Sequence, residues 1–165
     1  MKSLIDHLSQ YASYHRNPTN VLTHSVGIPM IVVSTLAFLS RPAIPAGGVP
    51  LSPAVVVVLG ATLFYLRLDR RYGLAMGAVL SLALAGAAAL AAGTTETWLA
   101  ASGGLFAGGW LVQFVGHGIE GRKPAFLDDL VGLAVGPLFL VAEAGFVLGL
   151  RREVRDSIRA RVSAA

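Results

Sequence analysis

Most of this chain consists of long apolar stretches that are interrupted only by short polar links. Four of them approach or reach the roughly 20 residues of a membrane crossing, and they cover residues 21–39, 53–66, 72–92 and 98–115. A fifth apolar segment covers residues 130–150. Charged residues make up only 13% of the chain, about half their usual share in a soluble domain. Such a chain cannot cover itself with polar surface, so the sequence predicts an integral membrane protein.

The segments around these stretches complete the predicted fold. Residues 3–16 carry apolar side chains at helical spacing, which predicts an N-terminal amphipathic helix that ends before Asn17-Pro18. Residues 40–52 are rich in proline and glycine and predict a loop. We therefore expect an all-α polytopic membrane helix bundle over residues 1–165 as a single domain. It would have four full spans plus a broken or re-entrant fifth hydrophobic segment.

The fifth segment decides where the C-terminus lies. Its 21 residues could cross the membrane once, but Gly136-Pro137 lies near its middle, where a helix would bend or break. With a cytoplasmic N-terminus and four crossings, a fifth crossing leaves seven Lys and Arg inside and six outside. A segment that folds back leaves twelve inside and only Arg41 outside. Because lysine and arginine gather on the cytoplasmic side, we expect both termini there.

The composition excludes several classes of function. The chain has no cysteine, so disulfides, thiolate metal sites and cysteine nucleophiles are ruled out. No basic patch is interleaved with aromatics, so we expect no nucleic-acid partner and assign the net charge of +4 to topology and anionic lipid headgroups. Nucleophile elbows, phosphate-binding loops and dinucleotide fingerprints are also missing. Glycines spaced four apart predict close helix packing, at 73/77, 104/108, 132/136 and 145/149.

Three histidines fall at one membrane face in this topology. His15 lies on the N-terminal helix, His24 near the start of the first span, and His117 at the end of the fourth. Glu120 follows His117 by three residues and shares its helical face if the helix continues. Three imidazoles with a carboxylate suit a first-row metal such as Fe(II) or Zn(II). The same groups also fit a hydrogen-bonded structural cluster in a lipid-binding or scaffold protein.

Four other polar residues have simpler interpretations. His7 falls near the edge of the apolar stripe and is expected at the surface. Arg122 and Lys123 fit topology or headgroup contacts, and they could also receive a substrate carboxylate. Glu143 lies inside the fifth apolar segment, where an ionisable group is costly. It is either a functional group, such as the proton carrier of a small transporter, or a residue nearer the headgroups.

Two blocks of this sequence resemble the signatures of a known family, the Mpo1-like family. The two blocks occur in the family's order with a hydrophobic stretch between them, so the resemblance covers most of the chain. The first consists of Tyr14-His15-Arg16-Asn17-Pro18-Thr19-Asn20 and Thr23-His24-Ser25-Val26-Gly27-Ile28-Pro29, and the second of Gln113-Phe114-Val115-Gly116-His117-Gly118-Ile119-Glu120-Gly121-Arg122-Lys123-Pro124-Ala125.

The resemblance implies a membrane-embedded, Fe(II)-dependent dioxygenase that acts on 2-hydroxy fatty acids with O₂. Such an enzyme shortens the acid by one carbon in fatty acid α-oxidation. The matching positions would be the metal ligands and catalytic residues: His15, His24, His117 and Glu120. Arg122 or Lys123 would steer the carboxylate. Membrane lipids are expected partners, and the oligomeric state is left open. High Ala, Gly and Arg usage favours a bacterial inner membrane, with the endoplasmic reticulum as the eukaryotic equivalent.

Overall fold

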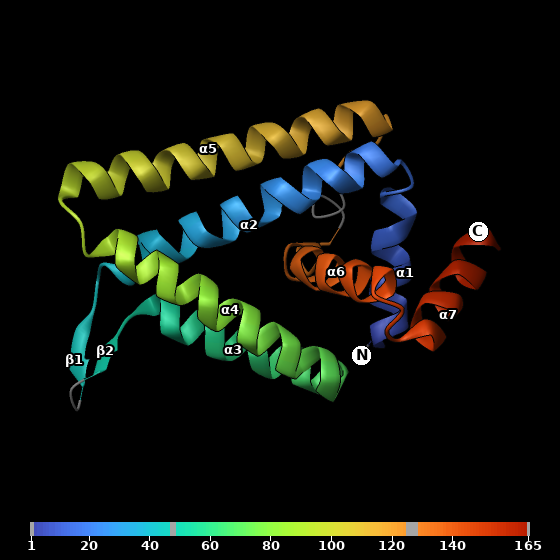
Figure 1. Ribbon diagram of the computed structural model, residues 1–165, viewed down its shortest axis with the longest axis horizontal. Coiled ribbons are helices and arrows are strands. Elements are labelled where there is room, and N and C mark those ends of the chain that lie inside the picture. Colours follow the sequence, from blue (N-terminus) through green and yellow to red (C-terminus); the bar gives the residue numbers. More distant parts are fainter. Residues whose placement is uncertain (1, 47–48, 125–128, 165) are drawn as a thin grey trace. The chain divides into compact units, whose positions relative to one another are not determined.

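The computed structural model describes residues 2–46, 49–124 and 129–164. Within these residues the chain forms seven helices and one small hairpin (Figure 1). The elements are α1 (Leu4–Tyr14), α2 (Pro18–Ser40), β1 (Ile44–Ala46), β2 (Val49–Leu51), α3 (Pro53–Leu68), α4 (Arg70–Ala91), α5 (Thr95–Glu120), α6 (Gly132–Val147) and α7 (Arg152–Ser163).

Two compact units make up the chain. The first, here called the terminal unit, consists of Met1–Val26 and Val112–Ala165. The second, the central unit, is Gly27–Leu111. The expectation of one integral membrane domain over residues 1–165 stays a prediction.

Three helices in the described part of the chain are long and apolar enough to cross a membrane: α2, α4 and α5. Helix α3 is apolar but shorter. Its 16 residues span about 24 Å, less than the roughly 30 Å hydrocarbon core of a bilayer. Three of the predicted spans are thus helices long enough to cross a membrane, or four if the bent pair of α6 and α7 is counted as one span, and the four full spans predicted from the sequence are not confirmed.

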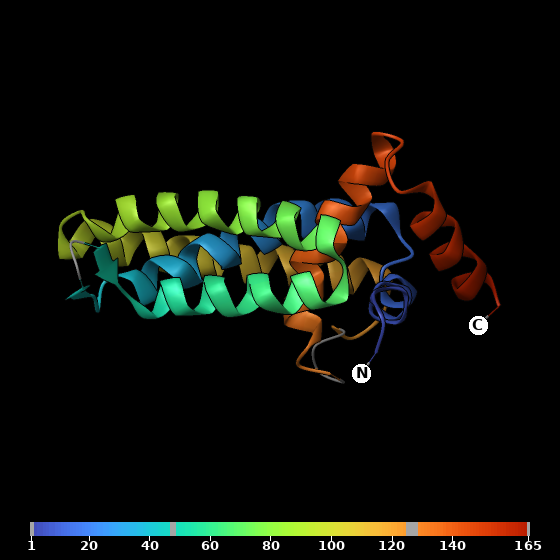
Figure 2. The same ribbon diagram turned by 90° about the horizontal axis from the view of Figure 1, so that it is seen from below.

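The end of α3 is set by Asp69. Its carboxylate accepts the N–H groups of Arg71 and Tyr72 at 2.9 and 3.0 Å, which caps α4 and starts it at once. The two helices then run side by side (Figures 1 and 2). A Cβ at Gly73 would lie 2.6 Å from the backbone of Leu66. Glycine is therefore required for this contact, as the 73/77 spacing predicted.

The segment between α2 and α3 differs from the predicted loop. It contains β1 and β2, which pair antiparallel with Ile44 opposite Leu51 and Ala46 opposite Val49. Proline is compatible with the extended backbone of a short edge strand, so the proline content of this segment does not prevent pairing.

Helix α1 organises the terminal unit. It begins with a capping box in which Ser3 and Asp6 exchange hydrogen bonds. Its apolar side packs against α6 and α7, with Leu8 fully buried and the Tyr11 ring 5.0 Å from that of Phe139. The predicted N-terminal helix is present, and its apolar stripe is covered by protein in this structure.

The fifth apolar segment breaks, but not where the sequence indicated. Pro137 lies inside α6, which continues to Val147. The chain then turns, and α7 leaves at 114° to α6 (Figure 2). Two positive φ angles make this turn, 74° at Gly149 and 51° at Arg151. The proline is tolerated because it removes only one backbone hydrogen bond in the second turn of α6.

Candidate metal centre

His15 lies at the junction of α1 and α2. The sequence placed it on the N-terminal helix, but α1 ends at Tyr14 and His15 is the residue that caps it. Its Nδ1 donates to the carbonyl oxygen of Tyr11 at 2.8 Å, and its ring stacks on the Tyr11 ring with centroids 4.2 Å apart. Burial holds the pKa of His15 below its ordinary value, partly offset by that hydrogen bond and by the Glu120 charge. The imidazole is therefore neutral near pH 7.

His24 lies in the second turn of α2 and is only 2% exposed. Its Nδ1 donates to the carbonyl oxygen of Asn20, one helical turn earlier, at 2.8 Å. Because a carbonyl oxygen can only accept, the proton of a neutral His24 is on Nδ1. The lone pair on Nε2 then points away from the helix, as it does in His15.

His117 lies in the last turn of α5, directly after a close contact with α2. A Cβ at Gly116 would lie 2.1 Å from Oγ1 of Thr23 and 2.4 Å from Oδ1 of Asn20. Glycine thus lets the two helices approach closely at this point. The helix ends soon afterwards, where Gly121 adopts a φ of 71°.

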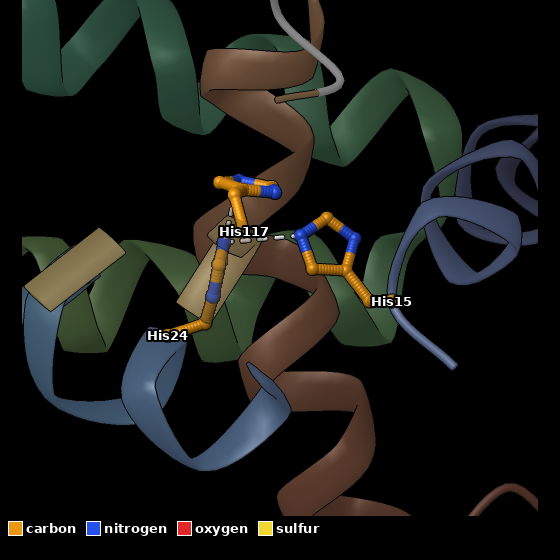
Figure 3. A group of neighbouring side chains, drawn as sticks. All are labelled: His15, His24 and His117. Carbon is orange, nitrogen blue, oxygen red and sulfur yellow. Dashed lines mark hydrogen bonds between the residues drawn. The ribbon is translucent and has the colours of Figure 1, made fainter. Parts of the chain in front are cut away.

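The three imidazoles converge through their Nε2 atoms (Figure 3). His24 Nε2 lies 3.0 Å from that of His15 and 3.2 Å from that of His117. Among the described residues, the three histidines form a group that could hold a metal ion, with one ligand nitrogen from each ring and all three nitrogens within 4.8 Å of one another. The structure thus brings together the three histidines that the sequence placed at one membrane face.

This arrangement fits a metal ion. With both Nδ1 atoms donating to carbonyl groups, neutral His15 and His24 direct two Nε2 lone pairs at each other, which is repulsive unless a cation lies between them. Nitrogens bound to one ion at about 2.0–2.1 Å lie about 2.8–3.4 Å apart for angles between 90° and tetrahedral. The two spacings from His24, 3.0 and 3.2 Å, fall in that range, and all three ligand nitrogens lie within 4.8 Å of one another.

Glu120, the predicted fourth ligand, faces the α1–α2 junction. One carboxylate oxygen accepts the N–H of Arg16 at 3.1 Å. The other accepts the N–H of Asn17 at 2.9 Å and the side-chain amide of Asn20 at 3.1 Å. The carboxylate is not part of the three-nitrogen group, and its role as a ligand stays a prediction.

The two candidate substrate cations lie just beyond α5. Arg122 donates from Nη1 to the carbonyl oxygen of Ser13 at 2.9 Å, so it contacts the chain close to His15. Lys123 is exposed. Contact of either residue with a substrate carboxylate stays a prediction.

Two other predictions have a clear structural outcome. His7 was expected at the surface, but it is only 7% exposed and lines a small cavity with Gln10, Tyr11 and Asp129. It is buried because α6 covers this side of α1. Glu143 is half-buried on α6, with Arg159 of α7 as a charged neighbour. It is therefore near protein charge as well as apolar surface.

Sequence reasoning missed Asn20 and Gly116. Asn20 is fully buried, holds His24 through its backbone and contacts Glu120 through its side chain. Both residues immediately adjoin the signature histidines, one helical turn before His24 and one residue before His117. That proximity was the available signal.

Two comparisons with known proteins identify the family of this chain. Residues 1–147 match the family model described as 2-hydroxy-palmitic acid dioxygenase Mpo1-like. The chain is also 35% identical, over 162 residues, to the 2-hydroxy-palmitic acid dioxygenase MPO1 of Saccharomyces cerevisiae, an alignment that covers 95% of this chain and 90% of the yeast protein. No solved structure matches the chain. With both signature blocks inside the matched region and their histidines converging, the chain belongs to the Mpo1-like family.

Proposed function

We propose that the protein is an Fe(II)-dependent dioxygenase that converts 2-hydroxy fatty acids to fatty acids one carbon shorter. The observation that carries the proposal is the convergence of three Nε2 atoms from His15, His24 and His117. The substrate class comes from the name of the yeast relative, a 2-hydroxy-palmitic acid dioxygenase. Imidazoles suit iron among other first-row metals, and the use of O₂ requires a redox-active metal, which zinc is not.

The proposed reaction balances without a further reductant. Cleavage of the C1–C2 bond turns C2 into the carboxyl group of the shorter acid and releases C1 as carbon dioxide. These two changes yield four electrons, which reduce both oxygen atoms of O₂: one leaves as water and the other enters the new carboxyl group. Bound iron would supply O₂ activation and hold the hydroxyl and carboxylate oxygens of the substrate.

The protein's own residues orient the ligands and the substrate. The carbonyl oxygens of Tyr11 and Asn20 fix the rings of His15 and His24 with Nε2 turned inward. Arg122 or Lys123 would attract the substrate carboxylate at the end of α5. The exposed side of α5 beside His117 is apolar, with Phe114, Val115 and Ile119 about half exposed. We propose that the acyl chain stays in lipid along this face.

The proposal is tested with protein purified without oxygen and loaded with Fe(II). We expect about one iron per chain, oxygen uptake on adding 2-hydroxypalmitate but not palmitate, and a 15-carbon acid as product. His117→Ala should lose both bound iron and turnover, because two imidazoles hold a divalent ion poorly.

The matched control is His7→Gln, which changes the fourth histidine outside the cluster. It should retain iron and turnover. Wild-type protein that binds no iron would instead favour a scaffold with a structural histidine cluster. Full activity in His117→Ala would refute the site.

A further inference from the structure

The position of Glu120 is unusual for a carboxylate. It is the last residue of α5, where the negative end of the helix dipole disfavours another negative charge. A negative charge in this unfavourable position needs stabilising contacts from other parts of the chain. Here the compensation comes from another segment, because the carboxylate accepts three N–H groups from Arg16, Asn17 and Asn20.

These three donors adjoin the other two histidines. Arg16 and Asn17 follow His15 directly, at the start of α2, whose positive end favours an anion. Asn20 holds the His24 ring through its carbonyl oxygen and donates its side-chain amide to Glu120. Glu120 itself follows His117 by three residues on the same helix. One carboxylate thus joins the three chain segments that carry the imidazoles.

We propose that Glu120 and Asn20 are positioning residues that hold His15, His24 and His117 in register for the metal, and that Glu120 acts through these hydrogen bonds rather than as a ligand. The set of Glu120, the Arg16 and Asn17 N–H groups and the Asn20 amide is called the Glu120 clamp below. The inference rests on the proposed function for its metal. A carboxylate has about four acceptor sites, and the clamp occupies three of them.

The clamp makes a specific prediction for Glu120→Gln. All three partners of the Glu120 carboxylate are hydrogen-bond donors. The glutamine replaces one acceptor oxygen by an NH₂ group, which also donates, so at least one of the three hydrogen bonds is lost. Removing such an outer hydrogen bond typically weakens metal binding by about 10- to 100-fold. We expect a loss of that size for Co(II), used as a spectroscopic substitute for iron. At saturating Co(II), the visible spectrum should match the wild type, because the ligand set is unchanged.

A reciprocal exchange separates the clamp from a ligand. Asn20→Asp alone places two carboxylates together and should bind Co(II) more weakly than Glu120→Gln. The double variant Glu120→Gln/Asn20→Asp reverses the direction of this hydrogen bond. The amide introduced at position 120 donates an N–H to the carboxylate introduced at position 20. We expect the double variant to recover at least tenfold in affinity over Asn20→Asp. A ligand role predicts a changed Co(II) spectrum in Glu120→Gln and no such recovery, and either result overturns the proposal.

Two controls complete the experiment. Glu96→Gln removes an exposed carboxylate from the first turn of the same helix and should bind Co(II) like the wild type; weakened binding there would mean that charge alone explains the effect, against the clamp. Hydrogen exchange at the Arg16 and Asn17 amides, measured without metal, should be faster in Glu120→Gln. If the Glu120→Gln protein is folded and these two amides exchange at the wild-type rate, the clamp is overturned. Wild-type protein that binds neither Fe(II) nor Co(II) would refute the proposed function, and the exchange result would still decide the clamp.

Discussion

At the scale of single residues, the spacing between α2 and α5 depends on the missing side chain of Gly116. A Cβ at this position would overlap Oγ1 of Thr23 and Oδ1 of Asn20. Thr23 cannot simply rotate away without cost, because its hydroxyl donates to the carbonyl oxygen of Asn20 at 2.7 Å. The same carbonyl group orients His24. A change at Gly116 should therefore disturb both the packing and the histidine cluster.

We expect Gly116→Ala to lower the free energy of unfolding by about 1–3 kcal/mol, the usual cost of overpacking a tight contact. It should also weaken binding of Fe(II) or Co(II), because His24 and His117 are forced apart. Gly118→Ala is the matched control, since nothing lies within 4 Å of a Cβ there. Alanine in that helical position should be neutral or slightly stabilising. Thermal unfolding and metal titration of both variants measure the two effects, and equal behaviour would contradict the packing argument.

The sequence predicted the histidines better than their supports. His15, His24 and His117 stood out as polar groups at the ends of apolar segments, and the predicted topology placed them at one membrane face. The hydrogen bonds of Glu120 to Arg16, Asn17 and Asn20 join residues about 100 positions apart. Helical spacing reports only neighbours on the same helix, so it placed Glu120 beside His117 and could not show its partners on another segment.

At the scale of elements, α7 is held on α1 by buried apolar side chains and by an ion pair. Val154 and Ile158 are buried, while Arg161 hydrogen-bonds and pairs with Asp6. This hydrogen bond, followed by those from Ser3, holds the pKa of Asp6 well below its ordinary value of 3.8. Because the folded pKa is depressed, the pair stabilises the docked helix above about pH 4. The contribution is lost as the pH falls further and Asp6 is protonated.

Arg161→Ala should therefore loosen α7 at pH 7 but not at strongly acidic pH. Hydrogen exchange of the α7 amides, corrected for the intrinsic rate at each pH, measures the effect. Both groups are partly exposed, so we expect a modest increase at pH 7, in line with surface pairs. Arg155→Ala is the control, because its partner Asp156 lies on the same helix. An effect of Arg161→Ala that persists after Asp6 is protonated would contradict the assignment.

Helix existence was predictable from the sequence, whereas helix ends depended on particular caps. Long apolar runs require satisfied backbone groups in lipid, which makes them helices. The end of α3 follows from Asp69, which caps the next helix. The break before α7 follows from positive φ angles at Gly149 and Arg151. An arginine with positive φ is uncommon, so the residue type at position 151 did not indicate a break. Pro137 did indicate one, but α6 continues through it.

At the scale of the whole molecule, contacts within the terminal unit constrain the topology. Helix α7 packs on α1, and Arg16 donates from Nη2 to the carbonyl oxygen of Val162 at 3.5 Å. Helices that pack on each other in this way would lie on the same side of the membrane, which is what the charge count of the sequence predicts. Helix α6, whose 16 residues span about 24 Å, is then expected to return without crossing, and this stays a prediction.

The charge distribution indicates which side this is. Helix α7 contains four arginines, and α1 is flanked by Lys2 and Arg16. Because such cations favour the cytoplasm, a fluorescent reporter fused after Ala165 should be active there, and so should one fused before Met1. An alkaline phosphatase inserted after Pro42, next to Arg41, should be active, because this loop is expected on the periplasmic side. A fluorescent reporter that folds only in the cytoplasm should be dark at the same position. A C-terminal reporter that is active only outside would require α6 to cross fully. The contacts between α1 and α7 could not then form, so this result would overturn the arrangement of the terminal unit as well as the topology.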